Sequence, residues 1–228
     1  MQEIKENPIQ SSSISNNWTR EDKAYVVIIA KGRFPHHDIP LRYLKKASYI
    51  VCCDGAANDF ISDGGIPDAI VGDGDSISEE YKSRFAHILH RDPDQETNDL
   101  TKSVRFCVSQ GKKDIIIIGG TGKREDHTIG NISLLAEYVN IANVRMLTNY
   151  GIFTPINSNT TFDSYKGEKL SIFSIDSKII STKGLRFELV DRALTNWWQG
   201  TLNESLGDSF SIDTTGRLII FQVYNLLD

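Results

Sequence analysis

The sequence predicts an α/β fold, with a doubly wound, mostly parallel sheet in three layers followed by a smaller all-β sandwich. Short apolar runs alternate with helical stretches as far as about residue 149, which is typical of parallel strands joined by right-handed crossovers. The run 114–120 is continuously apolar and β-branched, as expected of a strand buried on both faces. Beyond Asn149, short segments of alternating hydrophobicity follow one another, which favours a sandwich or small barrel.

Each element of the first part follows from this alternation. Residues 1–20 are polar, rich in Ser and Asn and without periodicity, so we expect a mobile leader there. An α/β domain is then predicted over 21–149. Its expected strands are 24–30, 48–54, 68–73, 87–91, 114–120 and 143–148, and its expected helices lie around 39–47, 55–65, 98–110 and 126–139.

The predicted β domain spans 150–228 and contains no convincing amphipathic helix. Its candidate strands alternate apolar and polar residues and are separated by Gly, Asn and Asp; they are 169–175, 177–182, 184–190, 208–213 and 217–223. Because the domain is short, we expect it to pack against the first domain or against a partner subunit.

The composition narrows the class of protein. A net charge of −5 argues against a nucleic-acid-binding protein, which normally carries a basic face, and gives no reason to expect binding to an anionic membrane. No run of 18 apolar residues and no signal peptide is present, and such a run is what a membrane-spanning helix requires. The three cysteines include an adjacent pair without zinc-ligand spacing, which fits buried thiols in a reducing compartment. We therefore expect a cytoplasmic protein.

A pair of carboxylates follows the third predicted strand. Asp73 and Asp75 flank Gly74 in the segment VGDGDSIS, residues 71–78. The spacing can point both carboxylates the same way in an extended turn, and carboxylate oxygens are the ligands that Mg²⁺ prefers, with water and phosphate oxygens completing its shell. Asp54 and Gly55 lie at the end of an earlier predicted strand, where Asp54 can bind a metal or cap a helix.

Two further loops carry charged or glycine residues. The loop 91–103 holds four acidic residues within eight positions and then Lys102; Asp99 and Lys102 would share one face of a helical first turn. The loop 117–131 contains Gly-Gly-Thr-Gly followed by basic residues, which allows close approach of the backbone to phosphate. It matches neither a Walker loop nor a dinucleotide fingerprint.

The four loops together predict more than each one does alone. Taken singly, each also fits an ordinary turn or a helix cap. However, ligands bind at the carboxyl ends of the strands in doubly wound sheets, and all four loops follow predicted strands. The sequence therefore predicts a site for Mg²⁺ and a nucleotide.

The order and spacing of these motifs resemble the thiamine pyrophosphokinases. The motifs are CCDGAAN, VGDGDSIS, DPDQETNDLTK and GGTGKREDHTIGN, with GLRFELV and TLNESLGDSFSI similar to the C-terminal signatures of that family. The resemblance covers nearly everything after residue 24. It implies an enzyme with an α/β domain and a β-sandwich that transfers pyrophosphate from ATP to the hydroxyl of thiamine. It also implies Mg²⁺ dependence and a homodimer whose active sites are shared between subunits.

The resemblance assigns roles to particular positions. It implies that Asp73, Asp75 and Asp99 are catalytic carboxylates that also bind the metal, and that Asp99 lies near the attacking hydroxyl. Asp54 is implied as a further metal ligand. The ATP-facing positions implied are Asp54, Gly55, Gln95, Lys102, Gly119, Gly120, Thr121, Gly122, Arg124 and Asp126. The candidates for thiamine are Asn203 and the tryptophans Trp197 and Trp198, although the two tryptophans fit interface packing equally well.

The chain departs from the family pattern in three places: Asn98 stands where Thr is usual, Leu202 where Ser is usual, and the pair Arg186-Phe187 where Lys-Trp is usual. The sequence leaves two alternatives open. One is a diphosphotransferase acting on another small alcohol, and the other is a thiamine or nucleotide sensor without catalysis.

Overall fold

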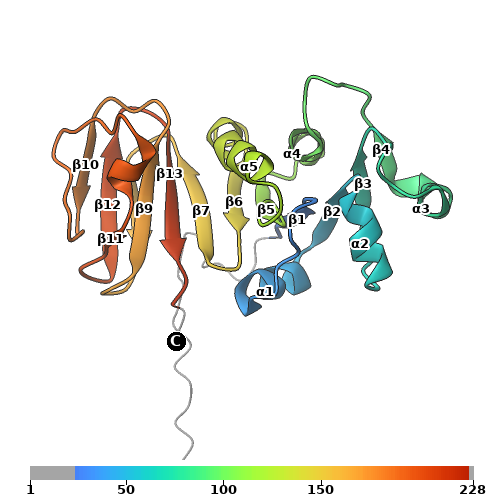
Figure 1. Ribbon diagram of the computed structural model, residues 1–228, viewed down its shortest axis with the longest axis horizontal. Helices are drawn as coiled ribbons and strands as arrows, with labels where there is room; N and C mark the ends of the chain where they lie inside the picture. The colour runs from blue at the N-terminus through green and yellow to red at the C-terminus, as the bar shows by residue number, and fades with distance from the viewer. Residues whose placement is uncertain (1–23, 226–228) are drawn as a thin grey trace, which may run out of the picture.

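The computed structural model describes residues 24–225, and within them one sheet runs through the whole molecule (Figure 1). This sheet has ten strands in the order β11-β9-β13-β7-β6-β5-β1-β2-β3-β4, and a second sheet has three strands in the order β10-β12-β8. The strands of the first part are β1 Val26–Ile29, β2 Tyr49–Cys53, β3 Ala69–Gly72, β4 Leu89–Arg91, β5 Asp114–Ile118 and β6 Asn143–Leu147. The predicted leader, 1–20, lies outside the described residues.

The first six strands are all parallel, and β1 lies in the middle between β2 and β5. All four residues of β1 are buried, as are the four isoleucines of β5, because helices cover both faces of this part of the sheet. Helices α4 and α5 lie on one side in Figure 1, and α1 and α2 lie on the other. The helices are α1 Asp38–Lys46, α2 Ala56–Ser62, α3 Glu79–Arg84, α4 Asp99–Ser109 and α5 Glu125–Tyr138, with a 3₁₀ turn η1 at Ala86–Ile88.

The sheet changes from parallel to antiparallel between β6 and β7. A tight turn joins them, in which the N–H of Thr148 donates to the carbonyl of Gly151. Only two residue pairs join β7 to β6, namely Met146 with Phe153 and Leu147 with Ile152. Pro155 lies beyond these pairs, so its missing N–H removes no hydrogen bond between the two strands. The C-terminal strands are β7 Gly151–Ile156, β8 Thr160–Asp163, β9 Lys169–Ser174, β10 Ile180–Lys183, β11 Asn203–Glu204, β12 Ser209–Thr214 and β13 Leu218–Val223.

The three-stranded sheet packs against the antiparallel end of the long sheet and closes a second core. Phe162 of β8 stacks on Phe210 of β12 with ring centroids 5.0 Å apart. Alternate residues of β9 and β13, such as Ile172 and Ile220, are fully buried between the sheets. The predicted combination of a parallel α/β sheet and a C-terminal sandwich is therefore confirmed, and the two parts share one continuous sheet.

Most predicted elements occur near their expected positions, with three differences. The segment 184–190 is a loop and not a strand, because the Glu188 carboxylate accepts the N–H groups of Gly184 and Leu185 and folds the chain back on itself. The strands β7, β8 and β11 and the short helix α3 were not expected. The α3 helix is capped by Ser78, whose hydroxyl accepts the N–H of Tyr81.

None of the helices in the described part of the chain combines the length and the apolar character that crossing a bilayer demands. The C-terminal part contains one helical turn within these residues, the 3₁₀ turn η2 at Trp197–Gly200. It packs against β9 at one end of the long sheet.

Candidate functional site

Three carboxylates meet around Gly72, the last residue of β3. Asp54 follows β2, Asp73 follows β3, and Asp99 is the first residue of α4. A Cβ atom on residue 72 would lie 2.5 Å from the Cβ of Asp54 and 3.1 Å from Oδ1 of Asp99, so only glycine allows the two aspartates to approach from either side. Parallel neighbouring strands therefore bring together carboxylates from three separate motifs.

Asp54 is fully buried. Its Oδ2 accepts the N–H of Ser76 at 2.9 Å, whereas its Oδ1 has no hydrogen-bond partner. Burial raises the pKa of Asp54, the Ser76 N–H opposes that rise, and contact with the Asp73 carboxyl adds to it. A buried carboxylate oxygen without a partner is costly to the fold, and it points to a ligand that completes this site.

Asp73 stays ionised beside it. The backbone N–H of Asp75 donates to Oδ1 of Asp73 at 2.9 Å, and this contact is the main reason that the pKa of Asp73 is lowered; Gln95 and Lys102 lower it further. The side chain of Asp75 is exposed at the tip of the turn. The structure thus brings the predicted Gln95 to Asp73 and places the predicted Asp75 next to it, where its backbone N–H contacts Asp73.

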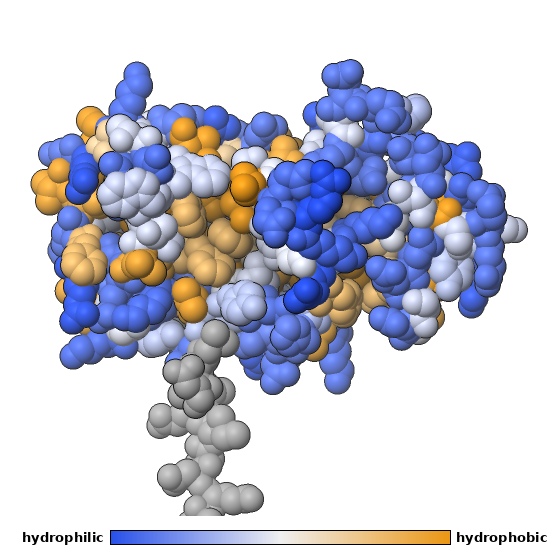
Figure 2. Space-filling model, in the orientation of Figure 1, coloured by the Kyte–Doolittle hydropathy of each residue, from blue (hydrophilic) through white to orange (hydrophobic). Residues whose placement is uncertain are grey.

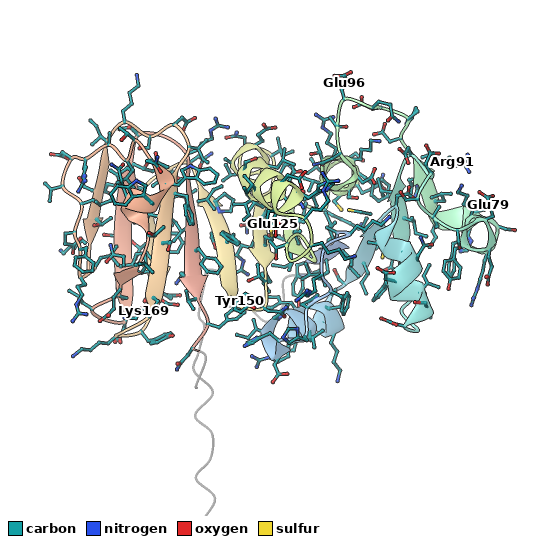
Figure 3. The ribbon with its side chains drawn as sticks, in the orientation of Figure 1. Glu79, Arg91, Glu96, Glu125, Tyr150 and Lys169 are labelled. Carbon is teal, nitrogen blue, oxygen red and sulfur yellow. The ribbon has the colours of Figure 1, made fainter. Side chains whose placement is uncertain are left out.

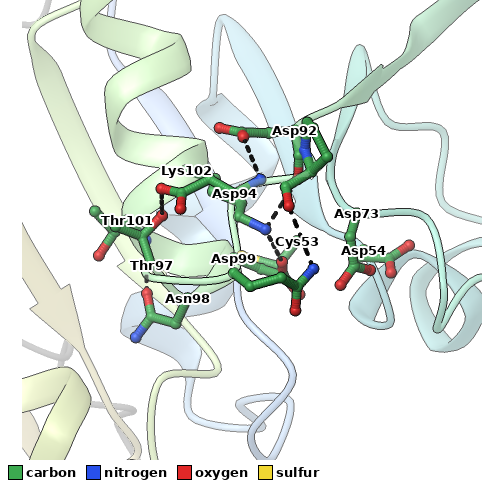
Figure 4. A network of polar contacts seen from close by, with 12 residues as sticks. Cys53, Asp54, Asp73, Asp92, Asp94, Thr97, Asn98, Asp99, Thr101 and Lys102 are labelled. Atoms are coloured by element: carbon green, nitrogen blue, oxygen red, sulfur yellow. Dashed lines mark hydrogen bonds and ion pairs between the residues drawn. The ribbon is translucent and has the colours of Figure 1, made fainter.

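Asp99 and Lys102 lie together on the first turn of α4, as their spacing predicts. Lys102 is buried; its Nζ lies 3.8 Å from Oδ1 of Asp99 and donates to the carbonyl of Asp92 at 3.0 Å (Figure 4). Burial raises the pKa of Asp99; the Lys102 ammonium opposes this rise, while Asp54 and Asp73 add to it. The helix begins here because the Asn98 side chain accepts the N–H of Thr101 at 2.8 Å.

The donor set suits Mg²⁺ bound together with a phosphate. Within residues 24–225, no three acidic, histidine or cysteine side chains form a ready-made metal cage. Mg²⁺ does not require one, since it usually takes one or two carboxylates and fills its shell with water and substrate phosphates. The unpartnered oxygen of Asp54 and the ionised Asp73 fit that requirement.

The glycine loop after β5 lies next to the loop that follows β1. Gly119 and Gly122 have φ values of +66° and +88°, which side chains rarely adopt. The N–H groups of Gly32 and Arg33 donate to the carbonyls of Gly119 and Thr121 at 2.6 and 2.7 Å, so the two loops form one surface. Because β1 alone separates β5 from β2, this surface lies roughly 10 Å from the carboxylates.

The remaining residues predicted to bind the nucleotide contact other residues of the protein. Arg124 and Asp126 are both exposed, and Nε of Arg124 donates to Asp126 Oδ1 at 3.1 Å. Gly120 packs against Met146, and its carbonyl accepts the side-chain amide of Asn131. Gly55 lies beneath the side chain of Lys31, whose Nζ would be 2.2 Å from a Cβ at residue 55.

The three candidates for thiamine lie at the opposite end of the sheet. Trp198 is 70% exposed, whereas Trp197 packs edge-on against Phe173 and donates from Nε1 to the carbonyl of Ser174 at 3.1 Å. Asn203 is buried, and its amide group pairs with both the N–H and the carbonyl of Phe187. Six strand spacings separate β9 from β2, which corresponds to roughly 25 to 30 Å along the sheet. One chain therefore does not bring these residues to Asp73.

Sequence reasoning missed two side chains at the carboxylate site. Asn58 of α2 holds the turn after β3, since it donates to the carbonyl of Ser76 at 2.7 Å and accepts the N–H of Ser78 at 3.0 Å. Lys31 lies over Gly55 and lowers the pKa of both Asp54 and Asp99, after larger contributions from burial and nearer groups. Its position directly after the first predicted strand was the available signal.

Comparison with known families identifies two adjoining matches along the chain. Residues 41–147 match the family model described as thiamin pyrophosphokinase, catalytic domain. Residues 151–221 match the model described as thiamin pyrophosphokinase, substrate-binding domain. The first match contains the three clustered aspartates, and the second contains the exposed tryptophan.

Relatives of known sequence and structure carry the same name. A thiamin pyrophosphokinase from Caenorhabditis elegans is 32% identical over 165 residues, covering 65% of this chain and 68% of that protein. A thiamine pyrophosphokinase from rice is 33% identical over 155 residues, covering 57% and 58% of the two chains. In structure, the yeast thiamin pyrophosphokinase gives a TM-score of 0.73 at 20% identity, with 90% of this chain and 88% of that chain covered. The enzyme from Geobacillus thermodenitrificans gives 0.72 at 18% identity, with 89% and 99% covered.

Proposed function

Because this chain belongs to the thiamin pyrophosphokinase family, we infer that it transfers the pyrophosphoryl group of ATP to the hydroxyl of thiamine. The products are thiamine diphosphate and AMP. We propose that residues 21–149 bind ATP and carry the catalytic side chains, and that residues 150–228 contribute the thiamine-binding surface.

The observation that carries this proposal is the meeting of Asp54, Asp73 and Asp99 around Gly72, with the buried Lys102 beside them. Transfer of a phosphoryl or pyrophosphoryl group depends chiefly on positioning and charge neutralisation and needs little covalent chemistry from the protein. A site with ionised carboxylates for a cation and an ammonium for phosphate oxygens supplies both.

We assign separate tasks to the three carboxylates. Asp73, assisted by Asp54, would hold Mg²⁺, which when bound offsets the negative charge of the phosphates. Asp99 orients the thiamine hydroxyl and accepts its proton, a role that its raised pKa favours because a base works best near the operating pH. Lys102 donates to phosphate oxygens and balances the charge of Asp99.

We propose that the thiamine surface acts on the carboxylate site of a second copy of the chain, in a homodimer. Figure 2 shows hydrophobic patches at the β9–β13 end of the molecule and a mainly hydrophilic surface at the α3 end. The exposed apolar side chains at the first end include Phe187, Val190, Trp198, Leu202 and Leu206. The 25 to 30 Å that separates these residues from Asp73 in one chain supports a site completed across the dimer.

We also propose that the enzyme works in the cytoplasm. Its three cysteines are free and buried, and burial raises the pKa of Cys107 to about 12. Thiols of this kind are inert structural residues that fit a reducing compartment.

The test is product analysis after mixing the purified protein with ATP, Mg²⁺ and thiamine, with and without a chelator. We expect thiamine diphosphate and AMP to appear together, and only when the metal is present. ADP with thiamine monophosphate would show single phosphoryl transfer and contradict the proposed reaction. Absence of any product, despite ATP binding, would indicate another alcohol substrate or a sensor.

A further inference from the structure

Lys31 reaches the carboxylate site from the loop after β1, whereas Lys102 belongs to α4 and donates to the carbonyl of Asp92, which follows β4. It is the first residue after Ala30, which follows β1, and its side chain crosses the first residues after β2. A Cβ at residue 55 would lie 2.6 Å from both Cδ and Cε of Lys31 and 2.2 Å from its Nζ. The absence of a side chain at Gly55 is therefore what allows Lys31 to lie across this position.

The backbone around Lys31 is fixed by the glycine loop. On one side, the N–H of Ala30 donates to the carbonyl of Ile118 at 2.9 Å; on the other, the N–H of Gly32 donates to Gly119 at 2.6 Å. A Cβ on residue 32 would lie 2.3 Å from the carbonyl oxygen of Gly119, so the contact requires glycine. Lys31 thus projects from a rigid junction of two loops, both of which follow parallel strands.

The charges around Lys31 leave its ammonium available. Within the described residues it forms no ion pair at contact distance, although it contributes favourably to the ionised forms of Asp54 and Asp99. Lys102, by contrast, is buried and already donates to the carbonyl of Asp92. Lys31 is exposed, so its flexible side chain can turn from the carboxylates to an anion that enters beside them.

We propose that Lys31 is a second phosphate-binding lysine of the site, which contacts the phosphate oxygens of the nucleoside triphosphate together with Lys102. The carboxylates would hold the cation, and the two ammonium groups would bind phosphate oxygens. This inference rests on the proposed function, since it names a residue that binds the ATP of that reaction. Lys31 acts in binding and leaves the attack of the hydroxyl to Asp99.

The experiment compares Lys31→Gln and Lys31→Arg with wild type and with Lys45→Gln, which removes an exposed lysine from α1, the helix that follows the same loop. Lys31→Gln is expected to weaken ATP binding, measured by calorimetric titration, and to raise the KM for ATP by roughly tenfold to a hundredfold, as for loss of one charge-assisted hydrogen bond. The KM for thiamine stays near wild type. Lys31→Arg keeps the positive charge, so its affinity for ATP should lie between those of Lys31→Gln and wild type.

Two results would overturn the inference. One is an ATP affinity of Lys31→Gln that equals that of Lys45→Gln. The other is an equal loss of affinity for ATP and thiamine with a lowered melting temperature, which would show a purely structural role. Failure of the proposed function is a separate result, because it appears as wild-type protein that makes no thiamine diphosphate while calorimetry still reports ATP binding.

Discussion

Asp73 is held ionised by a neighbouring backbone N–H, while burial raises the pKa of both Asp54 and Asp99. Environment, and not residue type, therefore separates the pKa of Asp73 from those of Asp54 and Asp99. Replacing Asp73 by Asn is expected to lower kcat by roughly a thousandfold, because the amide keeps the N–H contact but loses the charge. Thiamine binding should change little. Steady-state kinetics and thiamine titration measure the two effects, and near wild-type turnover would disprove the metal assignment.

Gly72 is a residue whose missing side chain makes the site possible. Gly72→Ala is expected to destabilise the protein by about 1–3 kcal/mol and to abolish turnover, because the new methyl group would lie 2.5 Å from the Cβ of Asp54. Gly130→Ala is the matched control: it lies within α5 with open space around it and should stabilise by about 0.5–1 kcal/mol. Denaturant unfolding of both variants measures these changes in stability. Equal stability of the two variants would contradict the claim that a side chain at residue 72 does not fit.

Glu168 predicts a pH dependence of stability in the C-terminal part. It is buried, and its Oε2 accepts hydrogen bonds from Ser164 and from Gln222. Burial raises the pKa of Glu168 above its usual 4.5. A raised pKa means that the fold favours the protonated form, so this contribution to stability is present below the unfolded pKa and is lost as pH rises through the folded pKa.

Glu168→Gln keeps an oxygen that accepts both hydrogen bonds and removes the titration. The variant should gain stability relative to wild type as the pH rises above about 4.5, measured by urea unfolding below and well above that pH. If the difference in stability between Glu168→Gln and wild type did not change with pH, titration of Glu168 would not be the cause of the pH dependence.

At the scale of elements, helix α4 positions two of the site residues and depends on its first turn. Asn98 stands where the family usually has Thr, and its side chain accepts the N–H of Thr101, so the substitution preserves the cap. Asn98→Ala should cost about 1 kcal/mol of stability and lower kcat/KM, because Asp99 and Lys102 both lie on that turn. Asn98→Thr should behave as wild type in thermal unfolding and kinetics. Equal behaviour of the Ala and Thr variants would show that the cap is unimportant.

The loops between elements also locate the site within the molecule. Figure 3 shows Glu96 at the outer end of the loop between β4 and α4, and Lys169 at the far end of the molecule. The acidic loop therefore lies far from the chain's own β-sandwich.

At the scale of the whole molecule, the continuous sheet keeps the proposed thiamine surface and the carboxylates apart. This predicts complementation between two defective variants, one altered in the carboxylate site and the other in the proposed thiamine surface. Mixed and refolded Asp73→Asn and Trp198→Ala chains should recover up to about a quarter of wild-type activity, because half of the dimers contain one intact shared site. Thiamine diphosphate formation before and after mixing measures this. No recovery from chains shown to be dimeric by sedimentation would contradict a shared site.

The sequence by itself determined the fold class, most strands and helices, and the convergence of aspartates from separate motifs at one edge of the sheet. Those predictions succeeded because apolar runs such as Ile115–Ile118 are local patterns, and because the carboxyl ends of parallel strands must share an edge. The tertiary structure decided what depends on distant residues. It placed Lys31 over Gly55 and put Gly72 between Asp54 and Asp99. It also folded 184–190 into a loop around Glu188 and kept Trp198 apart from Asp73, since such contacts arise only when separate elements pack together.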